Sequence, residues 1–252
     1  MGTTKLTRKE ILSEDPVHHA MIRSIEVVRA RGKIIGLSIV GLALVSVGAY
    51  LVLRFVENRQ SLAQQQLGRG IDLYHAQLDP QALDDPYGKG PDPVFRTDEA
   101  KYKTASKEFS GVMEKYGSTK AAVIARYYLG LCQLELNQKE AALKSLEAVR
   151  NNTKDRTIAY LGKKVLAKYF MGEGNYKGAQ EILEGMIKDP QCELPKEELK
   201  LEMARTYLAQ GKRDQAIKTL REARDSAVGS SLQPLISQEL DRLGSGSDGH
   251  QD

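Results

Sequence analysis

The chain has 252 residues, a formal net charge of +4 and two cysteines. Residues 1–33 hold seven Lys or Arg against four acids, so the rest of the chain is nearly neutral. A nucleic-acid-binding domain usually has a concentrated basic face with groove-reading elements. No such face is evident in this sequence, and we expect no nucleic-acid partner.

The first segment, residues 1–33, begins with a polar stretch. After Pro16, apolar residues recur every three to four positions, at Val17, Met21, Ile25 and Val28. This spacing predicts one short amphipathic helix. Such a helix fits either the surface of a membrane leaflet or a docking partner. We predict that residues 1–33 form a cytoplasmic segment.

The second segment contains twenty consecutive residues without a charge, from Ile34 to Leu53. At 1.5 Å per residue a helix of this length spans roughly 30 Å, the thickness of the hydrocarbon core of a bilayer. We predict a transmembrane helix over 34–55. A cleavable signal peptide is the alternative, with Val47-Gly48-Ala49 as its cleavage site. The long charged segment that precedes the apolar run favours a retained anchor.

The charges on either side of this span predict its orientation. Four basic residues, Arg23, Arg29, Arg31 and Lys33, lie within twenty residues before it, and three, Arg54, Arg59 and Arg69, lie within twenty residues after it. Since positive residues accumulate on the cytoplasmic side, the N-terminus is predicted to be cytoplasmic. The bulk of the chain then lies across the membrane.

The third segment, 56–97, starts as a membrane-proximal helix with apolar residues through Leu78. From Asp79 to Thr97 several Pro and Gly residues interrupt the helical pattern, so a long loop is expected. Long ordered loops are often functional. A tolerated surface insertion is the alternative interpretation of this loop, and it is the one we favour.

The fourth segment, 98–243, repeats itself every 37 residues. Small residues recur at one position (Gly130, Ala167, Ala204) and again at a second (Ala142, Ala179, Ala216). Asn or Gly recurs at a third (Asn137, Gly174, Gly211), and Leu at a fourth (Leu146, Leu183, Leu220). A period between about 20 and 50 residues indicates stacked repeats. Each unit is predicted to be a helix, a tight turn and a second helix, with Asn or Gly ending the first helix in the left-handed conformation. The last nine residues, 244–252, are expected to form a disordered tail.

The sequence contains no recognisable catalytic motif. It lacks G-x-S-x-G, P-loop and H-E-x-x-H patterns and a Cys/His pair. Cys132 and Cys192 have no His or Cys at metal-ligand spacing, and their sequence positions leave a disulfide between them undecided. We therefore expect no enzyme activity, cofactor, metal or small-molecule substrate.

The repeated residues resemble those of the tetratricopeptide repeat (TPR) family. Beyond the four recurring positions, the resemblance includes Phe170, Tyr176 and Tyr207. The sequence shows no alternating strand pattern, so no strand is expected and the chain is predicted to be all-α. With the resemblance, the predicted fold is one N-terminal transmembrane helix followed by a TPR-like α-solenoid of about four helix pairs. An earlier unit is indicated by Tyr102, Ala105 and Phe109, with the helix around Leu67-Gly68 as its partner.

The resemblance also implies a concave groove lined by the first helix of each unit. Mapped onto this sequence, the peptide-binding positions are Tyr127, Leu131, Leu134, Lys164, Lys168, Met171, Leu201, Arg205 and Leu208. Their aliphatic, aromatic and cationic side chains fit an extended or helical peptide with some acidic character. Lys164, Lys168 and Arg205 are equally well explained as ordinary solvated charges. The Lys and Asn set of carboxylate-clamp TPRs is not reproduced.

The order of segments resembles the bacterial ancillary SecYEG translocon subunit family. That family implies a single-pass protein of the bacterial inner membrane with a periplasmic C-terminal domain. Its expected partners are translocon subunits, secreted polypeptides or periplasmic chaperones. A structural scaffold for envelope assembly or cell division, with one fixed folded partner, is the alternative. A TPR receptor on an organelle surface, with a cytosolic domain, also fits the layout.

Overall fold

The computed structural model describes residues 16–81, 93–152 and 155–245, with the backbone alone given for residues 16–31, Ile35 and Ser245. Most of the expected Pro/Gly loop and the tail beyond Ser245 lie outside the described residues. The chain divides into two compact units, Met1–Asn58 and Arg59–Asp252.

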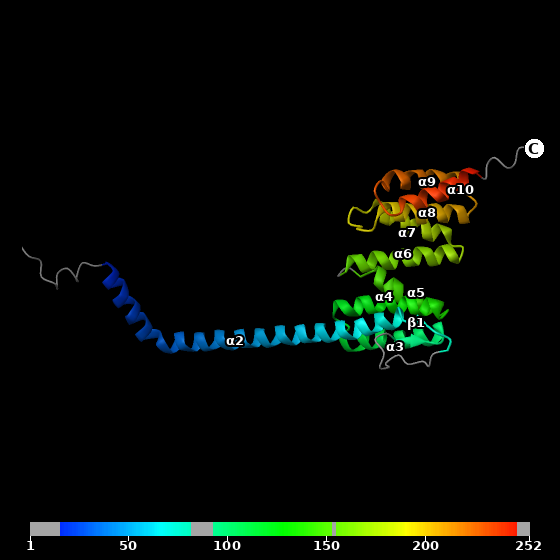
Figure 1. Ribbon diagram of the computed structural model, residues 1–252. Helices are drawn as coiled ribbons and strands as arrows, with labels where there is room; N and C mark the ends of the chain where they lie inside the picture. Colours follow the sequence, from blue (N-terminus) through cyan, green and yellow to red (C-terminus); the bar gives the residue numbers. More distant parts are fainter. Residues whose placement is uncertain (1–15, 82–92, 153–154, 246–252) are drawn as a thin grey trace, which may run out of the picture. The chain divides into compact units, whose positions relative to one another are not determined.

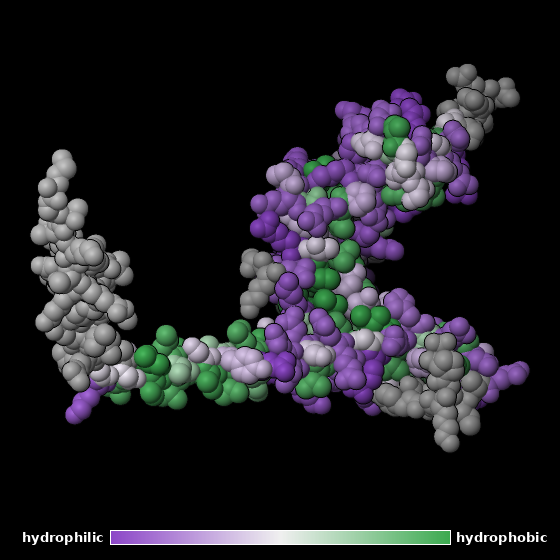
Figure 2. All heavy atoms as spheres, turned by 60° about the vertical axis from the view of Figure 1, so that its left-hand side comes forward, coloured by the Kyte–Doolittle hydropathy of each residue, from purple (hydrophilic) through white to green (hydrophobic). Residues whose placement is uncertain are grey.

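The first unit is formed by the greater part of helix α2, Pro16–Tyr74 (Figure 1). Its apolar side chains face outward, with Leu44 and Val45 about 70% exposed, and they form the green run in Figure 2. The hydroxyls of Ser38 and Ser46 donate to the carbonyls of Ile34 and Leu42 at 2.9 and 2.8 Å, so both polar groups are satisfied inside the helix. Within the described residues one helical stretch, Gly32–Tyr74, is long and apolar enough to cross a membrane. A signal sequence would meet the same criterion.

The second unit is an array of antiparallel helix pairs. The end of α2 packs on α3 (Asp98–Tyr116), and the pairs α4 (Lys120–Glu135) with α5 (Lys139–Arg150), α6 (Arg156–Gly172) with α7 (Tyr176–Lys188), and α8 (Lys196–Ala209) with α9 (Arg213–Ser226) follow. Helix α10, Gln233–Ser245, packs on α9 and ends the array. The predicted all-α solenoid of helix pairs is confirmed.

The turns inside three of the pairs share one backbone conformation. Asn137, Gly174 and Gly211 have φ values of 56°, 76° and 73°. In each turn the next residue's N–H bonds to a carbonyl five positions earlier, as from Gln138 to Gln133 at 2.7 Å and from Lys212 to Tyr207 at 2.9 Å. These are the bonds of a Schellman motif, which satisfies carbonyls at the end of the first helix. The left-handed turns expected from the 37-residue spacing are therefore present.

The remaining repeated positions form the interior. Ala142, Ala179 and Ala216 are fully buried, and each is followed four residues later by a Leu that is at most 2% exposed. Gly130 lies so close to Leu146 that a methyl group at its Cα would come within 2.8 Å of the Leu146 Cγ atom. Small residues let the two helices of a pair approach, while the leucines fill the space that remains.

One detail differs from the sequence-based expectations, and the structure also describes the two cysteines, whose pairing the sequence left undecided. A short parallel strand pair joins Gln77–Leu78 to Val94–Phe95, although no strand was expected. Two residues are too few to show an alternating pattern in the sequence. The Asp79 N–H donates to the carbonyl of Phe95 at 2.9 Å beside this pair, and Phe95 is buried. Cys132 and Cys192 are both free and belong to different core clusters. Burial raises the pKa of the Cys132 thiol to about 12, so this thiol is unreactive near neutral pH.

Candidate peptide-binding groove

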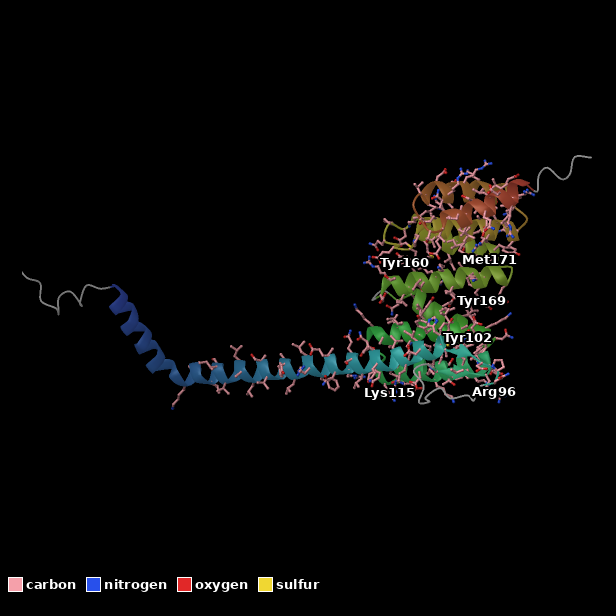
Figure 3. The ribbon with its side chains drawn as sticks, in the orientation of Figure 1. Arg96, Tyr102, Lys115, Tyr160, Tyr169 and Met171 are labelled. Atoms are coloured by element: carbon pink, nitrogen blue, oxygen red, sulfur yellow. The ribbon has the colours of Figure 1, made fainter. Side chains whose placement is uncertain are left out.

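Three of the expected groove residues line one pocket. Lys164, Lys168 and Met171 of α6 meet Glu202 and Thr206 of α8 around a cavity of about 250 Å³. Val165, Ala167 and Leu183 complete the lining. In Figure 3, Met171 and Tyr160 lie toward opposite ends of α6. The pocket thus lies between the first helices of two consecutive repeats.

The bottom of the pocket is apolar. Ala167 and Leu183 are each 2% exposed, and Thr206 is 1% exposed. The Thr206 hydroxyl donates to the carbonyl of Glu202 at 2.8 Å and lies 3.6 Å from the Met171 sulfur. Since this hydroxyl is already satisfied, a ligand group reaching the bottom of the pocket would meet methyl, methylene and thioether surface. A cavity of this size has room for one large aliphatic or aromatic side chain.

Two of the three expected groove cations are already paired with acids of the next repeat. The Lys164 ammonium lies 2.5 Å from a carboxylate oxygen of Glu198. The Arg205 guanidinium contacts Glu239 at 2.6 Å and Glu202 at 3.1 Å. The Lys164–Glu198 pair spans α6 to α8 and the Arg205–Glu239 pair spans α8 to α10, whereas Glu202 lies on α8 itself. Lys164 and Arg205 therefore join neighbouring repeats.

Lys168 differs from these two cations. Its side chain is exposed at the rim of the pocket, and among the described residues it has no salt bridge. One turn of helix separates it from Lys164, whose charge is neutralised by Glu198. Lys168 is thus the groove cation that an incoming carboxylate would meet.

The other predicted groove residues do not line this pocket. Leu201 is 2% exposed and belongs to the core cluster formed by α8, α9 and α10. Leu208 is half-buried against the same cluster. The α4 residues Tyr127, Leu131 and Leu134 are half-buried at a separate part of the array.

Around α4, neighbouring helices are joined by a cluster of aromatic side chains rather than by ion pairs. The Phe109 and Tyr128 rings stack with centroids 5.3 Å apart, and Tyr74 and Tyr127 approach Tyr128 edge-on at 5.3 and 5.5 Å. Burial raises the pKa of the Tyr127 hydroxyl, so this group stays neutral at physiological pH. Side chains from α2, α3 and α4 are joined here by ring contacts.

Glu202, Thr206 and Val165 were not among the residues expected from the sequence. The acidic partners do leave a signal, because Lys164 and Glu198, Arg205 and Glu239, and Lys139 and Glu173 each lie 34 residues apart. A cation followed by an acid at this constant offset identifies a link between repeats. Thr206 leaves no comparable signal, since a buried threonine cannot be distinguished from a surface one by its spacing.

Comparison with known proteins agrees with this architecture. Residues 125–152 and 170–238 each match a model of the tetratricopeptide repeat. The chain thus carries TPR repeats in a TPR-like α-solenoid, a fold that typically serves as a non-enzymatic scaffold for binding proteins.

A solved structure from Podospora anserina, assigned as a kinesin light chain with nearly identical TPR-like repeats, is 17% identical to this chain. It aligns with a TM-score of 0.48, over 78% of this chain and 88% of its own. No curated protein matches the sequence.

Proposed function

We propose that this protein is a membrane-anchored TPR module that binds extended polypeptides in the groove between α6 and α8. The observation that carries the proposal is the pocket with an apolar bottom and one cation, Lys168, without a salt bridge among the described residues. A large apolar side chain would fill the cavity, and an acidic group beside it would contact Lys168. This combination selects short segments in which an apolar residue neighbours an acid.

The ion pairs around the pocket support a groove that is preformed. Lys164–Glu198 and Arg205–Glu239 connect three successive first helices. A ligand therefore does not need to order these side chains on binding, which lowers the entropic cost of association. A site with one pocket and one charge also requires little of the ligand's sequence, which suits a protein that binds many different polypeptides.

The proposed setting is the exit side of a bacterial secretion channel. Support comes from the apolar helix over residues 34–55, from the basic residues that precede it, and from the resemblance in layout to ancillary translocon subunits. In this setting the second unit lies in the periplasm, where emerging polypeptides or periplasmic chaperones would enter the groove.

The test is site-specific photo-crosslinking in the full chain, kept in its membrane. A photoreactive residue at Lys168 is compared with one at Lys177, which is 88% exposed on α7 and does not line the pocket. We expect a heterogeneous set of unfolded secreted chains to be captured from position 168 and few from position 177. Equal capture from both positions would contradict the groove assignment. A single stoichiometric folded partner would instead identify a scaffold.

A binding measurement sharpens the same test. A labelled peptide with leucine next to aspartate is titrated against the purified full chain in detergent micelles. Reversing the charge with Lys168→Glu should weaken binding by about tenfold, because roughly 1.4 kcal/mol separates an attractive from a repulsive contact at such a site. Lys177→Glu is the matched control. Unchanged binding in Lys168→Glu would show that the peptide does not use this groove.

A further inference from the structure

The turn between α3 and α4 carries two lysines at its ends. Lys115 lies in the last turn of α3 and Lys120 is the first residue of α4, and both side chains are exposed. Among the described residues neither lysine takes part in a salt bridge. Glu114 is the one acid between Met113 and Lys120, so the turn has a local excess of positive charge.

One of these lysines has a position in its helix that does not favour the fold. A cation near the C-terminus of a helix is stabilised by the helix dipole, which accounts for Lys115. Lys120 lies at the opposite, positive end of α4, whose first turn contains no acid. A cation there is mildly unfavourable to folding. The charge of Lys120 therefore does not contribute to the stability of α4.

The turn is attached to the residue at which the second unit begins. The Arg59 guanidinium donates to the carbonyl of Lys115 at 2.5 Å. Arg59 follows Leu53, the last residue of the uncharged run, by six positions. Six residues reach roughly 9 Å as a helix and at most about 20 Å when extended. The polar headgroup zone on each side of a bilayer is roughly 5–8 Å thick. If residues 34–55 span a membrane, chain length keeps Arg59, and the turn to which it bonds, within about 20 Å of the hydrocarbon core.

The later turns between repeats differ in charge. The second, residues 150–156, is also basic, with Arg150, Lys154 and Arg156 against Asp155. The third, residues 188–198, is acidic, because two lysines face four acids, Asp189, Glu193, Glu197 and Glu198. The first two turns, which are nearest to Arg59 along the chain, are thus positively charged, and the third turn is negatively charged. An anionic surface would attract the first two turns and repel the third.

We propose that the Lys115–Lys120 turn binds the phosphate groups of anionic lipids and holds the first repeats against the bilayer surface. The inference rests on the membrane anchor of the proposed function. The part of the solenoid that carries this turn would then be held at the bilayer, while the groove between α6 and α8 stays open to solvent. Phosphate oxygens of two neighbouring headgroups would accept hydrogen bonds from the two ammonium groups.

The test uses a fluorophore on the turn. The variant Ser118→Cys places one exposed thiol between the two lysines, and the native Cys132 and Cys192 are buried at 0% and 7% exposure, which favours labelling of the new thiol. The labelled full chain is reconstituted into vesicles of neutral phosphatidylcholine, or of phosphatidylcholine with about 30 mol% phosphatidylglycerol, each with the same amount of a lipid bearing a quencher on its headgroup. The control carries its fluorophore at Lys177→Cys.

We expect quenching at position 118 to be at least about twofold stronger in the anionic vesicles, and to fall toward the neutral value at high salt. Adding Lys115→Glu and Lys120→Glu should remove the difference, whereas Lys177→Glu in the same Ser118→Cys background should preserve it. Equal quenching in both vesicles, with the chain inserted, would overturn the proposal and leave the anchor intact. A chain that does not float with the vesicles would overturn the anchor itself. Circular dichroism of the double variant checks that the solenoid stays folded.

Discussion

The first and last parts of the solenoid join their neighbouring helices in different ways. Around α2, α3 and α4, aromatic rings from three helices contact one another, with Phe109 stacked on Tyr128. From α6 onward, ion pairs such as Lys164–Glu198 and Arg205–Glu239 connect one first helix to the next. Both parts have small residues and large apolar residues packed in their interiors. The repeated residues therefore determine how the two helices of a pair pack together. The contacts between neighbouring pairs differ along the solenoid.

This difference has a functional consequence. Ring contacts bury apolar area and contribute strongly to stability, but they leave no charge for a ligand. Partly exposed ion pairs contribute little to stability, roughly 0–1 kcal/mol each. They do set the positions of polar groups around the pocket. The part nearer the proposed membrane anchor along the chain thus gains more stability from its contacts between helices, and the part farther along carries the pocket proposed for recognition.

The largest expected effect comes from disturbing the aromatic part at Gly70. A methyl group on Gly70 would lie 2.6 Å from the Phe109 ring, which is itself held by Tyr128. Gly70→Ala should therefore destabilise the protein by about 1–3 kcal/mol. Gly68, two residues away on the same helix, has no atom within 4 Å of such a methyl group. Gly68→Ala should be neutral or stabilising by up to about 1 kcal/mol. Denaturant midpoints of both variants, followed by circular dichroism, provide the comparison. Similar midpoints would show that α2 does not pack on α3 at this position.

A smaller effect is expected for the ion pairs of the later part. In a double-mutant cycle, Arg205→Met and Glu239→Gln should show a coupling energy of roughly 0.5–1 kcal/mol, reduced in high salt. The more exposed pair Lys139–Glu173 serves as the matched comparison and should show a weaker coupling. A coupling above about 3 kcal/mol for Arg205–Glu239 would mean that this part, too, depends on its links for stability.

The smallest effect is a dependence of stability on pH at the Tyr160–Asp189 contact. The Tyr160 hydroxyl donates to Asp189 at 2.5 Å, which lowers the pKa of the Asp189 carboxyl and raises that of Tyr160 to about 12. A carboxyl with a depressed pKa stabilises the fold above its unfolded-state pKa of about 3.9, and this contribution is lost as the pH falls through the folded value. The neutral tyrosine stabilises the fold below a pH of about 10, and that contribution is lost as the pH rises toward about 12.

The variant Tyr160→Phe removes the hydrogen bond and keeps the ring. Its melting temperature should therefore change less than that of the wild type between about pH 5 and 2.5, and again between about pH 10 and 12. Thermal melts across both ranges measure this effect. Parallel curves for the two proteins would show that the bond does not form in solution.

The helices and their turns were predictable from the sequence because their causes are local. A Gly or Asn that ends a helix in the left-handed conformation acts through its own backbone, so Asn137, Gly174 and Gly211 could be identified by spacing alone. The apolar run from Ile34 to Leu53 is likewise a property of consecutive residues. Of the residues predicted to line a groove, Lys164, Lys168 and Met171 come together at one pocket, and their role in binding stays a prediction.

Which of the predicted groove residues remain available to a ligand depends on the tertiary structure. Lys164, Lys168 and Arg205 are equivalent in the sequence, yet Glu198 and Glu239 neutralise two of them, and only stacking of the repeats brings those acids within reach. Leu201 is buried in the core cluster that α8 shares with α9 and α10. By itself, the sequence determined the helices, the repeat and the apolar segment, since these depend on neighbours along the chain. The tertiary structure decided which charges stay open to a partner, because that depends on residues about one repeat away.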